Sequence, residues 1–213
     1  MSRYDLVIFD CDGVLVDNER LAVSMESRVL TEMGWPLSEA DVIERFVGRS
    51  SVYMKDEIEK VIGRPVNWQT EFEDPFRVIC EQELTAIDGV RDALDAIATP
   101  TCVASSSSRS MVRFKLGLTG LLDRFDGRLF TSNDVEHAKP APDVFLFAAS
   151  QLDVAPERCA VIEDSVNGVL AGLAAGMDVF AYAGGVTRAS ELTHDGVRVF
   201  HEMRDLPALL GEA

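Results

Sequence analysis

Six short, almost wholly apolar runs recur along the chain, and they limit its fold more than any other feature. They are 4–10 (YDLVIFD), 101–105 (TCVAS), 127–131 (GRLFT), 158–163 (RCAVIE), 178–182 (DVFAY) and 197–200 (VRVF). Strands that are apolar throughout are typical of a parallel sheet that is covered on both faces. Segments with helical periodicity alternate with these runs from residue 88 onward. The sequence therefore predicts βαβ units in an α/β, Rossmann-like doubly wound fold.

Residues 17–87 interrupt this alternation. They predict amphipathic helices near 18–34, 38–47, 51–62 and 68–86, with breaks at Gly34-Trp35-Pro36, Gly48 and Gly63-Arg64-Pro65. The simplest account is a helical bundle inserted after the first strand. We therefore expect a core domain formed by 1–16 and 88–213, and a helical cap domain formed by 17–87. Asp17, at the junction, is expected either to contact the hinge or to cap the first helix.

The charge balance narrows the classes of partner. Lysine and arginine number 20 against 36 aspartates and glutamates, a formal net charge of −16. Such a surface repels phosphate backbones and anionic membranes, so neither nucleic acid nor a membrane is an expected partner. A phosphorylated ligand would have to be attracted by a local positive feature, such as a metal ion or a well-placed lysine.

Cysteine usage and the N-terminus bear on location and assembly. The four cysteines show no paired spacing that suggests zinc or disulfides, which favours buried thiols in a reducing compartment. The opening MSRYD lacks the charged-then-apolar layout of a secretory signal. We expect a cytoplasmic protein that is a monomer, with a weak homodimer as the alternative.

Polar side chains follow four of the predicted strands, where a doubly wound sheet binds its ligands. They are Asp10-Cys11-Asp12-Gly13, the serines 105–108, Lys139 a little downstream of 131–133, and Glu163-Asp164-Ser165. Mg²⁺ commonly takes two carboxylates, and a phosphoryl group in transfer needs positive charge and donors around it. Asp10 and Asp164 could supply the carboxylates, while Ser105 and Lys139 could supply a hydroxyl and a cation. The set predicts phosphoryl transfer.

The D-x-D spacing of the first group has its own meaning. Residues two apart in extended backbone point to the same side, so Asp10 and Asp12 can reach one site while Cys11 faces away. Gly13 then allows the chain to turn without a side chain that would crowd the site.

Four stretches, FDCDGVLVD, VASSSS, HAKPAPD and VIEDSVNGVLAGLAAGM, resemble the four ordered motifs of the haloacid dehalogenase superfamily. The resemblance covers the whole chain and fits the branch with a helical cap after the first motif. It implies that Asp10 is a nucleophile that forms an aspartyl-phosphate. It further implies that Asp12 is the general acid and base, with its backbone carbonyl on Mg²⁺. The superfamily's dehalogenases lack an acid at this second position, so Asp12 favours phosphoryl chemistry.

The same resemblance implies roles for the remaining motifs. Ser105 and Lys139 match the phosphate-binding hydroxyl and the cation between nucleophile and phosphate. Asp164 matches a metal ligand, with Glu163 as a second or water-mediated one. Backbone N–H groups near Gly13 and Ser106 would complete the phosphate cradle.

Three functions remain open on the sequence. The first is a Mg²⁺-dependent phosphatase of sugar or sugar-acid phosphates; SRYDLVIFDCDG, ERFVGRS and ELTAIDGVRDALDAI are similar to 6-phosphogluconate phosphatases, and Arg49 with Ser50 could bind that substrate. The second is a phosphomutase of the β-phosphoglucomutase type. That type has a cap histidine and a cap arginine, whose matching positions here are Ala22 and Ser51. The third is a non-enzymatic phospho-aspartate receiver module.

Overall fold

A computed structural model of the chain describes residues 3–47, 49 and 51–212. Its six-stranded sheet has the order β3-β2-β1-β4-β5-β6, and all neighbouring strands are parallel. The strands are β1 (Leu6–Phe9), β2 (Thr101–Ser105), β3 (Leu129–Thr131), β4 (Cys159–Glu163), β5 (Asp178–Tyr182) and β6 (Val197–Phe200). All six predicted strands are present, and the first, third and fourth are shorter than expected. The doubly wound α/β prediction is confirmed.

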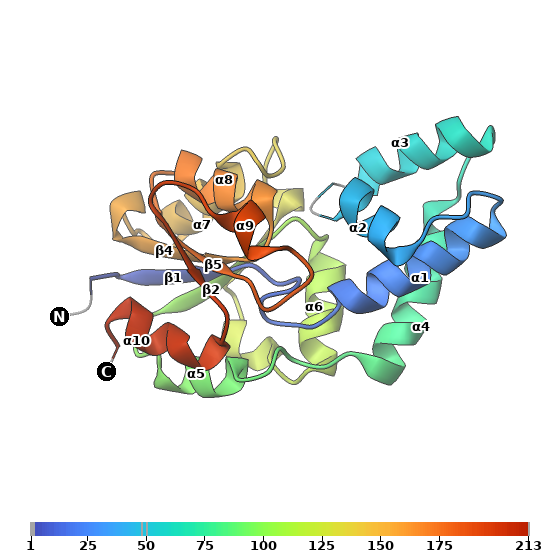
Figure 1. Ribbon diagram of the computed structural model, residues 1–213. Helices are drawn as coiled ribbons and strands as arrows, with labels where there is room; N and C mark the ends of the chain where they lie inside the picture. The colour runs from blue at the N-terminus through green and yellow to red at the C-terminus, as the bar shows by residue number, and fades with distance from the viewer. Residues whose placement is uncertain (1–2, 48, 50, 213) are drawn as a thin grey trace.

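Helices cover both faces of this sheet, as Figure 1 shows. One face packs against α5 (Val90–Ala96), α6 (Arg109–Leu118) and α10 (Leu206–Leu210). The other packs against α7 (Asp143–Gln151), α8 (Val166–Ala174) and α9 (Ala189–Leu192). The short helices α9 and α10 were not predicted, because four and five residues are too few to show a helical periodicity in the sequence. The near-continuous apolar character of the strands follows from this burial on both sides.

The strand order determines where the site can form. β1 lies between β2 and β4, with Phe9 paired to Val103 on one side and to Ile162 on the other. The residues that follow these strands, from Asp10, Ser105 and Glu163 onward, therefore leave the sheet at one edge. Crevices at that edge are where open parallel sheets bind ligands.

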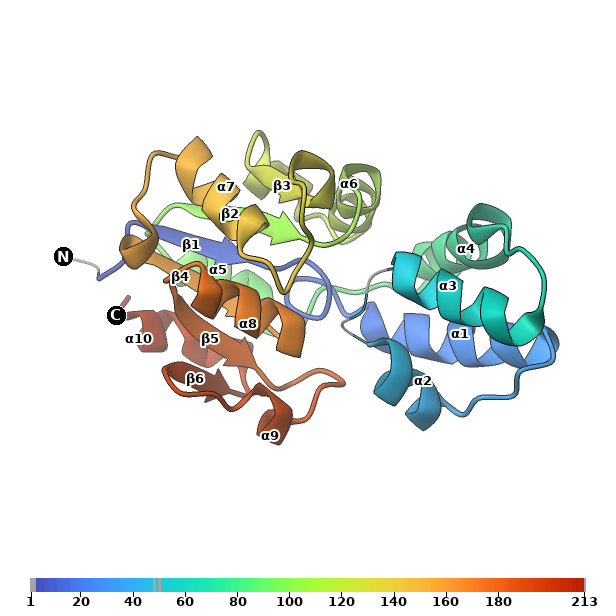
Figure 2. The ribbon, with the colours of Figure 1, turned by 90° about the horizontal axis from the view of Figure 1, so that it is seen from above.

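Residues 19–83 form a separate helical layer beyond that edge, visible at the right of Figure 2. Its elements are α1 (Glu19–Glu32), α2 (Glu39–Phe46), α3 (Ser51–Ile62), a π-helical turn η1 (Gln69–Glu73) and α4 (Asp74–Glu83). They bury an apolar cluster of their own, with Leu30, Val42 and Ile58 fully enclosed. The helix predicted over 68–86 is present as one continuous helical segment over 68–83, which begins with the π-turn and ends three residues earlier than expected. Pro75, which has no N–H to donate, lies at the start of α4, where the π-turn ends.

Two extended segments connect the helical layer to the core. The backbone N–H of Asp17 donates to the carbonyl of Thr85 at 2.9 Å, and that of Ile87 donates to Leu15 at 3.1 Å. Asn18, and not Asp17, is the N-cap residue of α1. The chain thus passes from the core to the helical layer and back through two adjacent segments, which supports our proposal that 17–87 is a cap domain on a core of 1–16 and 88–213. None of the described helices is long and apolar enough to cross a membrane.

Candidate active site

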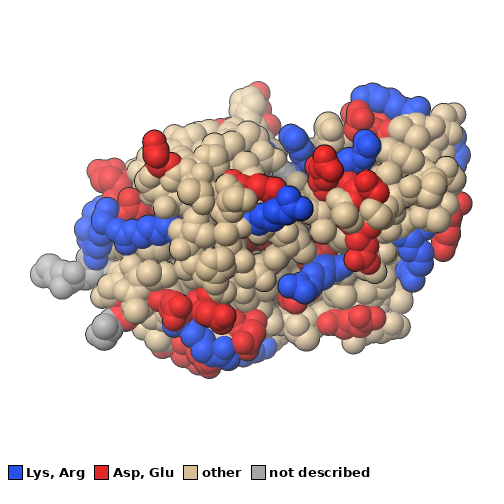
Figure 3. Space-filling view, in the orientation of Figure 1, with Lys and Arg blue, Asp and Glu red and all other residues tan. Residues whose placement is uncertain are grey.

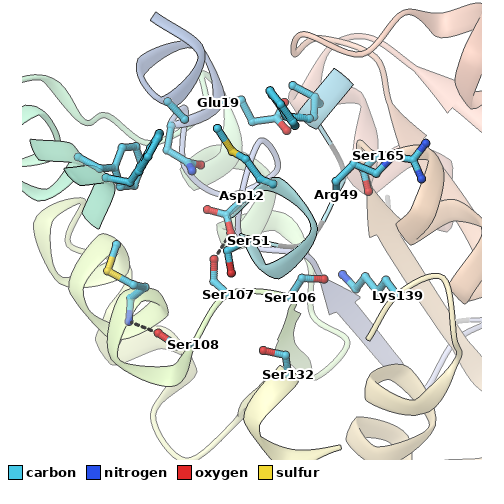
Figure 4. Close-up of a pocket in the computed structure, with 18 of the residues that line it drawn as sticks. Asp12, Glu19, Arg49, Ser51, Ser106, Ser107, Ser108, Ser132, Lys139 and Ser165 are labelled. Carbon is cyan, nitrogen blue, oxygen red and sulfur yellow. Dashed lines mark hydrogen bonds between the residues drawn. The ribbon is translucent and has the colours of Figure 1, made fainter. Parts of the chain in front are cut away.

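A cavity of about 570 Å³ lies between the carboxyl edge of the sheet and the cap. The core contributes polar side chains, including Asp10, Asp12, Lys139 and Asp164, and the cap contributes residues of α1, α3, η1 and α4. Figure 4 draws Asp12, Ser107 and Lys139 of the core and Glu19 of α1 around this space. On the face drawn in Figure 3, basic and acidic side chains alternate along the junction of the two parts.

Asp10 is held at the floor of the cavity by a lysine and a backbone amide. Its Oδ1 accepts a hydrogen bond from Lys139 Nζ at 2.6 Å, and its Oδ2 accepts one from the backbone N–H of Asp12 at 2.9 Å. Lys139 also donates to Glu163 Oε1 at 2.7 Å. Burial raises the pKa of Asp10 to about 7, and the ammonium of Lys139 acts against this rise. Burial disfavours charge on Lys139 as well, but the two carboxylates outweigh it and raise the lysine's pKa.

Asp12 is held by a different cation. Lys115, on α6, forms an ion pair with Asp12 Oδ1, while Ser107 Oγ donates to Asp12 Oδ2 at 2.7 Å, as Figure 4 shows for the serine. Burial disfavours the carboxylate, but Lys115 and Ser107 outweigh it and lower the pKa of Asp12. Asp10 and Asp12 therefore face one site, as predicted, and each has its own lysine.

The four serines after β2 differ in position. Ser105 is fully buried, and its Oγ accepts a hydrogen bond from the backbone N–H of Ser107 at 3.1 Å. Ser106 and Ser107 line the cavity instead. Ser108 is the N-cap residue of α6 and accepts from Met111. Ser105, expected at the phosphate, is not among the described residues that line the cavity, but its Oγ lies 3.5 Å from Asp12 Oδ2.

Gly13 lacks a side chain at a point where the Asp164 carboxylate lies close to the backbone. It has a φ of +70°, and a Cβ there would lie 1.8 Å from Asp164 Oδ2. Its N–H donates to the carbonyl of Val16 at 3.0 Å, so the amide expected in a phosphate cradle already has a partner within the chain. A side chain at this position would push Asp164 out of the site.

The carboxylates around Asp164 fit a divalent cation. Asp164 is 2% exposed, and its Oδ2, like Glu19 Oε2, is buried with no hydrogen-bond partner among the described residues. A Cβ on Gly185 would lie 3.5 Å from the first of these oxygens and 3.6 Å from the second, so the two share one space. Burial raises the pKa of Glu19 to about 7. Buried carboxylate oxygens without donors are the ligands that Mg²⁺ accepts.

Glu163 is less suited to that role in this structure. Its Oε1 accepts from Lys139, and its Oε2 accepts from the backbone N–H and the hydroxyl of Ser165, each at 3.0 Å. Within the described residues, no three histidine, cysteine or acidic side chains already form a metal cluster. The oxygens without donors would hold a cation between Asp164 and Glu19. Asp10, whose oxygens accept from Lys139 and from the Asp12 N–H, would join them by exchanging one of these bonds for the metal.

The cap-side predictions have mixed outcomes. Arg49 lines the cavity, with its guanidinium 5.5 Å from the ring centre of Tyr53. Ala22 and Ser51, the positions compared with a mutase, line it as well. Ser50, expected beside Arg49, falls outside the described residues. Sequence reasoning missed Glu19, Ser107 and Lys115; a lysine on the buried face of a helix was the one signal that could have indicated Lys115.

Glu26 lies two turns along α1 from Glu19, on the same face, and lines the same cavity. Burial, and then the charge of Glu19, raises the pKa of Glu26 to about 8. A carboxyl with a raised folded-state pKa stabilises the fold below its unfolded pKa, and that contribution is lost as the pH rises through 8. Glu26→Gln should therefore gain ~1–3 kcal/mol over the native chain between pH 5 and 9, after allowance for partial exposure. Urea unfolding at both pH values measures this, with exposed Glu32→Gln as the control; equal behaviour of the two variants would contradict it.

Comparisons with known proteins agree with this geometry. A family profile described as haloacid dehalogenase-like hydrolase matches residues 4–176. The 6-phosphogluconate phosphatase of Escherichia coli K12 is 32% identical over 98% of this chain and 96% of its own length. A haloacid dehalogenase-like protein of Agrobacterium tumefaciens superimposes with a TM-score of 0.85 at 37% identity, covering 98% of each chain. A hydrolase of this family from Deinococcus radiodurans, solved with phosphate and sodium, gives 0.81 at 32%, covering 100% of this chain and 97% of its own. The chain belongs to the haloacid dehalogenase-like hydrolases.

Proposed function

We propose that this hydrolase is a Mg²⁺-dependent phosphatase of small phosphorylated metabolites that works through an aspartyl-phosphate on Asp10. One observation carries the proposal: Asp10 is paired with Lys139 at 2.6 Å and stands beside a second carboxylate, Asp12, at the floor of one cavity. A buried cation next to a nucleophilic carboxylate offsets the charge that a phosphoryl group brings. The phosphatase relative and the phosphate-bound structural neighbour are consistent with this chemistry.

The residues divide the reaction into two displacements. An Asp10 oxygen attacks phosphorus and breaks its bond to the substrate oxygen. Because Lys115 outweighs burial and lowers the pKa of Asp12, Asp12 must first take up a proton from solvent, and it then gives that proton to the departing alcohol. Asp12 then takes a proton from water, and that water oxygen attacks phosphorus and breaks the bond to Asp10. Lys139 stays protonated and keeps the carboxylates and phosphoryl oxygens from repelling one another. Mg²⁺, when bound, would be held by Asp10, Asp164 and the backbone carbonyl of Asp12, and it would add positive charge beside the phosphoryl group.

The substrate we favour is 6-phosphogluconate, within the wider class of sugar and sugar-acid phosphates. The support is the similarity to the Escherichia coli enzyme and the place of Arg49 at the cavity wall. A guanidinium there could bind a carboxylate, which few other groups on the cap side could do. Phosphate release from a panel of sugar and sugar-acid phosphates, with Mg²⁺ and again with EDTA, tests this. Mg²⁺-dependent release led by 6-phosphogluconate is expected, and a flat profile would contradict the substrate alone.

Arg49→Ala should separate acid from neutral substrates. We expect KM for 6-phosphogluconate to rise ~10-fold while KM for glucose 6-phosphate changes less than ~2-fold, since a charge-assisted contact is worth about 1.5–3 kcal/mol before solvent screening. Arg45→Ala is the control, because Arg45 stacks on Trp35 and is not among the described cavity-lining residues. Steady-state kinetics on both substrates measure the shift. Equal increases for the two substrates would show that Arg49 does not read the acid group.

The alternative hypotheses fare less well. Ala22 and Ser51 line the cavity at the positions where the mutase type has a histidine and an arginine, and they offer neither group. Conversion of β-glucose 1-phosphate into glucose 6-phosphate, without phosphate release, would nevertheless favour the mutase. A non-enzymatic receiver module is not supported, because the matched family consists of hydrolases.

A further inference from the structure

We propose that Lys115 is a positioning residue that holds the carboxylate of Asp12 in place for proton transfer. This inference rests on the proposed function, in which Asp12 moves the proton of each displacement. The proposal rests on the mutual contacts of three side chains, those of Lys115, Ser107 and Asp12. Lys115 Nζ binds Asp12 Oδ1 and donates to Ser107 Oγ at 3.0 Å, and Ser107 Oγ donates to Asp12 Oδ2 at 2.7 Å.

The helix α6 explains how the lysine reaches this point. Ser108 caps α6, and Lys115 lies about two turns into it, on the face that also buries Val112 and Leu116. Long side chains on a helix lean back toward its N-terminus. The ammonium of Lys115 is thereby carried to the end of β2 and the D-x-D loop, and its side chain is only 2% exposed.

The burial of Lys115 calls for an explanation beyond stability. Removing an ammonium from water costs several kcal/mol, and an apolar side chain of similar volume is often as stable or more so. The rest of this helix face is apolar, so a methionine would suit it. Among the described residues, Asp12 is the one acidic side chain that pairs with Lys115. The lysine is therefore explained by its contact with the Asp12 carboxylate and not by the packing of α6.

The two buried lysines have separate partners. Lys139 binds Asp10 and Glu163, whereas Lys115 binds Asp12. Without Lys115, the Asp12 carboxylate would be free to turn toward Lys139 and compete with Asp10 for its ammonium. Held by Lys115 and Ser107, Asp12 stays beside the nucleophile without taking its counter-ion. In both displacements the proton moves between Asp12 and an oxygen of the alcohol or water, and Lys115 keeps its own protons.

The first experiment compares leaving groups in Lys115→Met, with Arg113→Met, an exposed position on the same helix, as the control. Glucose 6-phosphate releases an alkoxide that needs a proton, whereas p-nitrophenyl phosphate releases a phenolate that does not. We expect kcat on glucose 6-phosphate to fall ~10²-fold with KM within ~2-fold, since general acid–base catalysis supplies ~10²–10⁴. The initial burst of p-nitrophenol in stopped flow should stay within ~3-fold of the native rate. Equal losses in both assays, or a faster variant, would overturn the proposal.

A double-mutant cycle shows whether Lys115 acts through Asp12. In the Asp12→Asn background, Lys115→Met should change the p-nitrophenol burst and the steady-state rate by less than ~2-fold. A further loss as large as in the native background would show a structural role and overturn the inference. Ser107→Ala, which leaves both charges in place, should show the same leaving-group pattern with a smaller loss, and it keeps the test valid if Lys115→Met does not fold.

These outcomes are separable from failure of the proposed function. If the native protein released no phosphate from any substrate, or if Asp10→Asn retained activity, the phosphatase proposal itself would fail. If the native protein is an active phosphatase and the Lys115 and Ser107 variants show no leaving-group dependence, only the role of Lys115 fails.

Discussion

Asp10→Asn is expected to lower phosphate release by at least ~10⁵-fold, the scale seen when an enzyme loses its covalent nucleophile. An amide oxygen is a far weaker nucleophile than a carboxylate, but it keeps the shape of the side chain. It can still accept a hydrogen bond from Lys139, which also keeps Glu163 as a partner at 2.7 Å. The fold should therefore persist, as circular dichroism and thermal unfolding would check. Asp126→Asn, an exposed carboxylate outside the site, is the matched control.

Trapping the intermediate makes this test specific. Native protein mixed with substrate and quenched in acid should carry an acyl phosphate that hydroxylamine releases. Asp10→Asn should carry none, whereas Asp12→Asn should still form it from p-nitrophenyl phosphate and hydrolyse it slowly. Retained turnover or a retained acyl phosphate in Asp10→Asn would move the nucleophile to another residue.

The core of this site was predictable because strand ends in a parallel sheet converge. Asp10, Asp12 and Asp164 follow apolar runs, so their meeting at one edge follows from the topology. Lys139 has no such position and was identified through the resemblance of its motif. The contact between Lys139 and Asp10 at 2.6 Å agrees with that identification.

Other parts of the site depend on local geometry that no pattern specifies. The turn from β2 into α6 brings the hydroxyl of Ser107 to 2.7 Å and that of Ser105 to 3.5 Å from Asp12 Oδ2, and the run of serines does not specify which of them is nearer. Lys115 was missed because a charged residue within an amphipathic helix is normally assigned to the solvent face. Glu19 was missed because it approaches Asp164 only through the folding of the cap junction over Gly13. The cap residues that face the substrate could not be predicted either. Apolar residues that line a cavity recur with the same helical spacing as apolar residues that fill a core.

Lys139→Met is expected to damage both activity and stability, and the loss of stability should depend on pH. The variant leaves Asp10 and Glu163 buried at 9% and 1% side-chain exposure without their shared cation. Breaking a buried pair in this way costs about 3–5 kcal/mol of unfolding free energy. Turnover should fall at least ~10³-fold, since charge stabilisation of this kind is worth about 10²–10³ for a single donor and Lys139 also orders the nucleophile. Exposed Lys60→Met is the control.

The sign of the pH dependence follows from Asp10. Its pKa is already about 7 with Lys139 lowering it, so removal of the lysine raises it further. A carboxyl whose folded-state pKa is raised contributes stability at low pH and loses it as the pH rises through that pKa. Native Asp10 and the variant's Asp10 lose it alike below about pH 7, so the deficit of Lys139→Met should be constant near pH 5–6 and widen between about pH 7 and 9. Urea unfolding across both ranges measures it, and a deficit that stays constant over both would contradict the assignment of a buried charge. Adding Glu163→Gln should recover part of the stability and none of the turnover, because it removes one uncompensated carboxylate but returns no cation to the nucleophile.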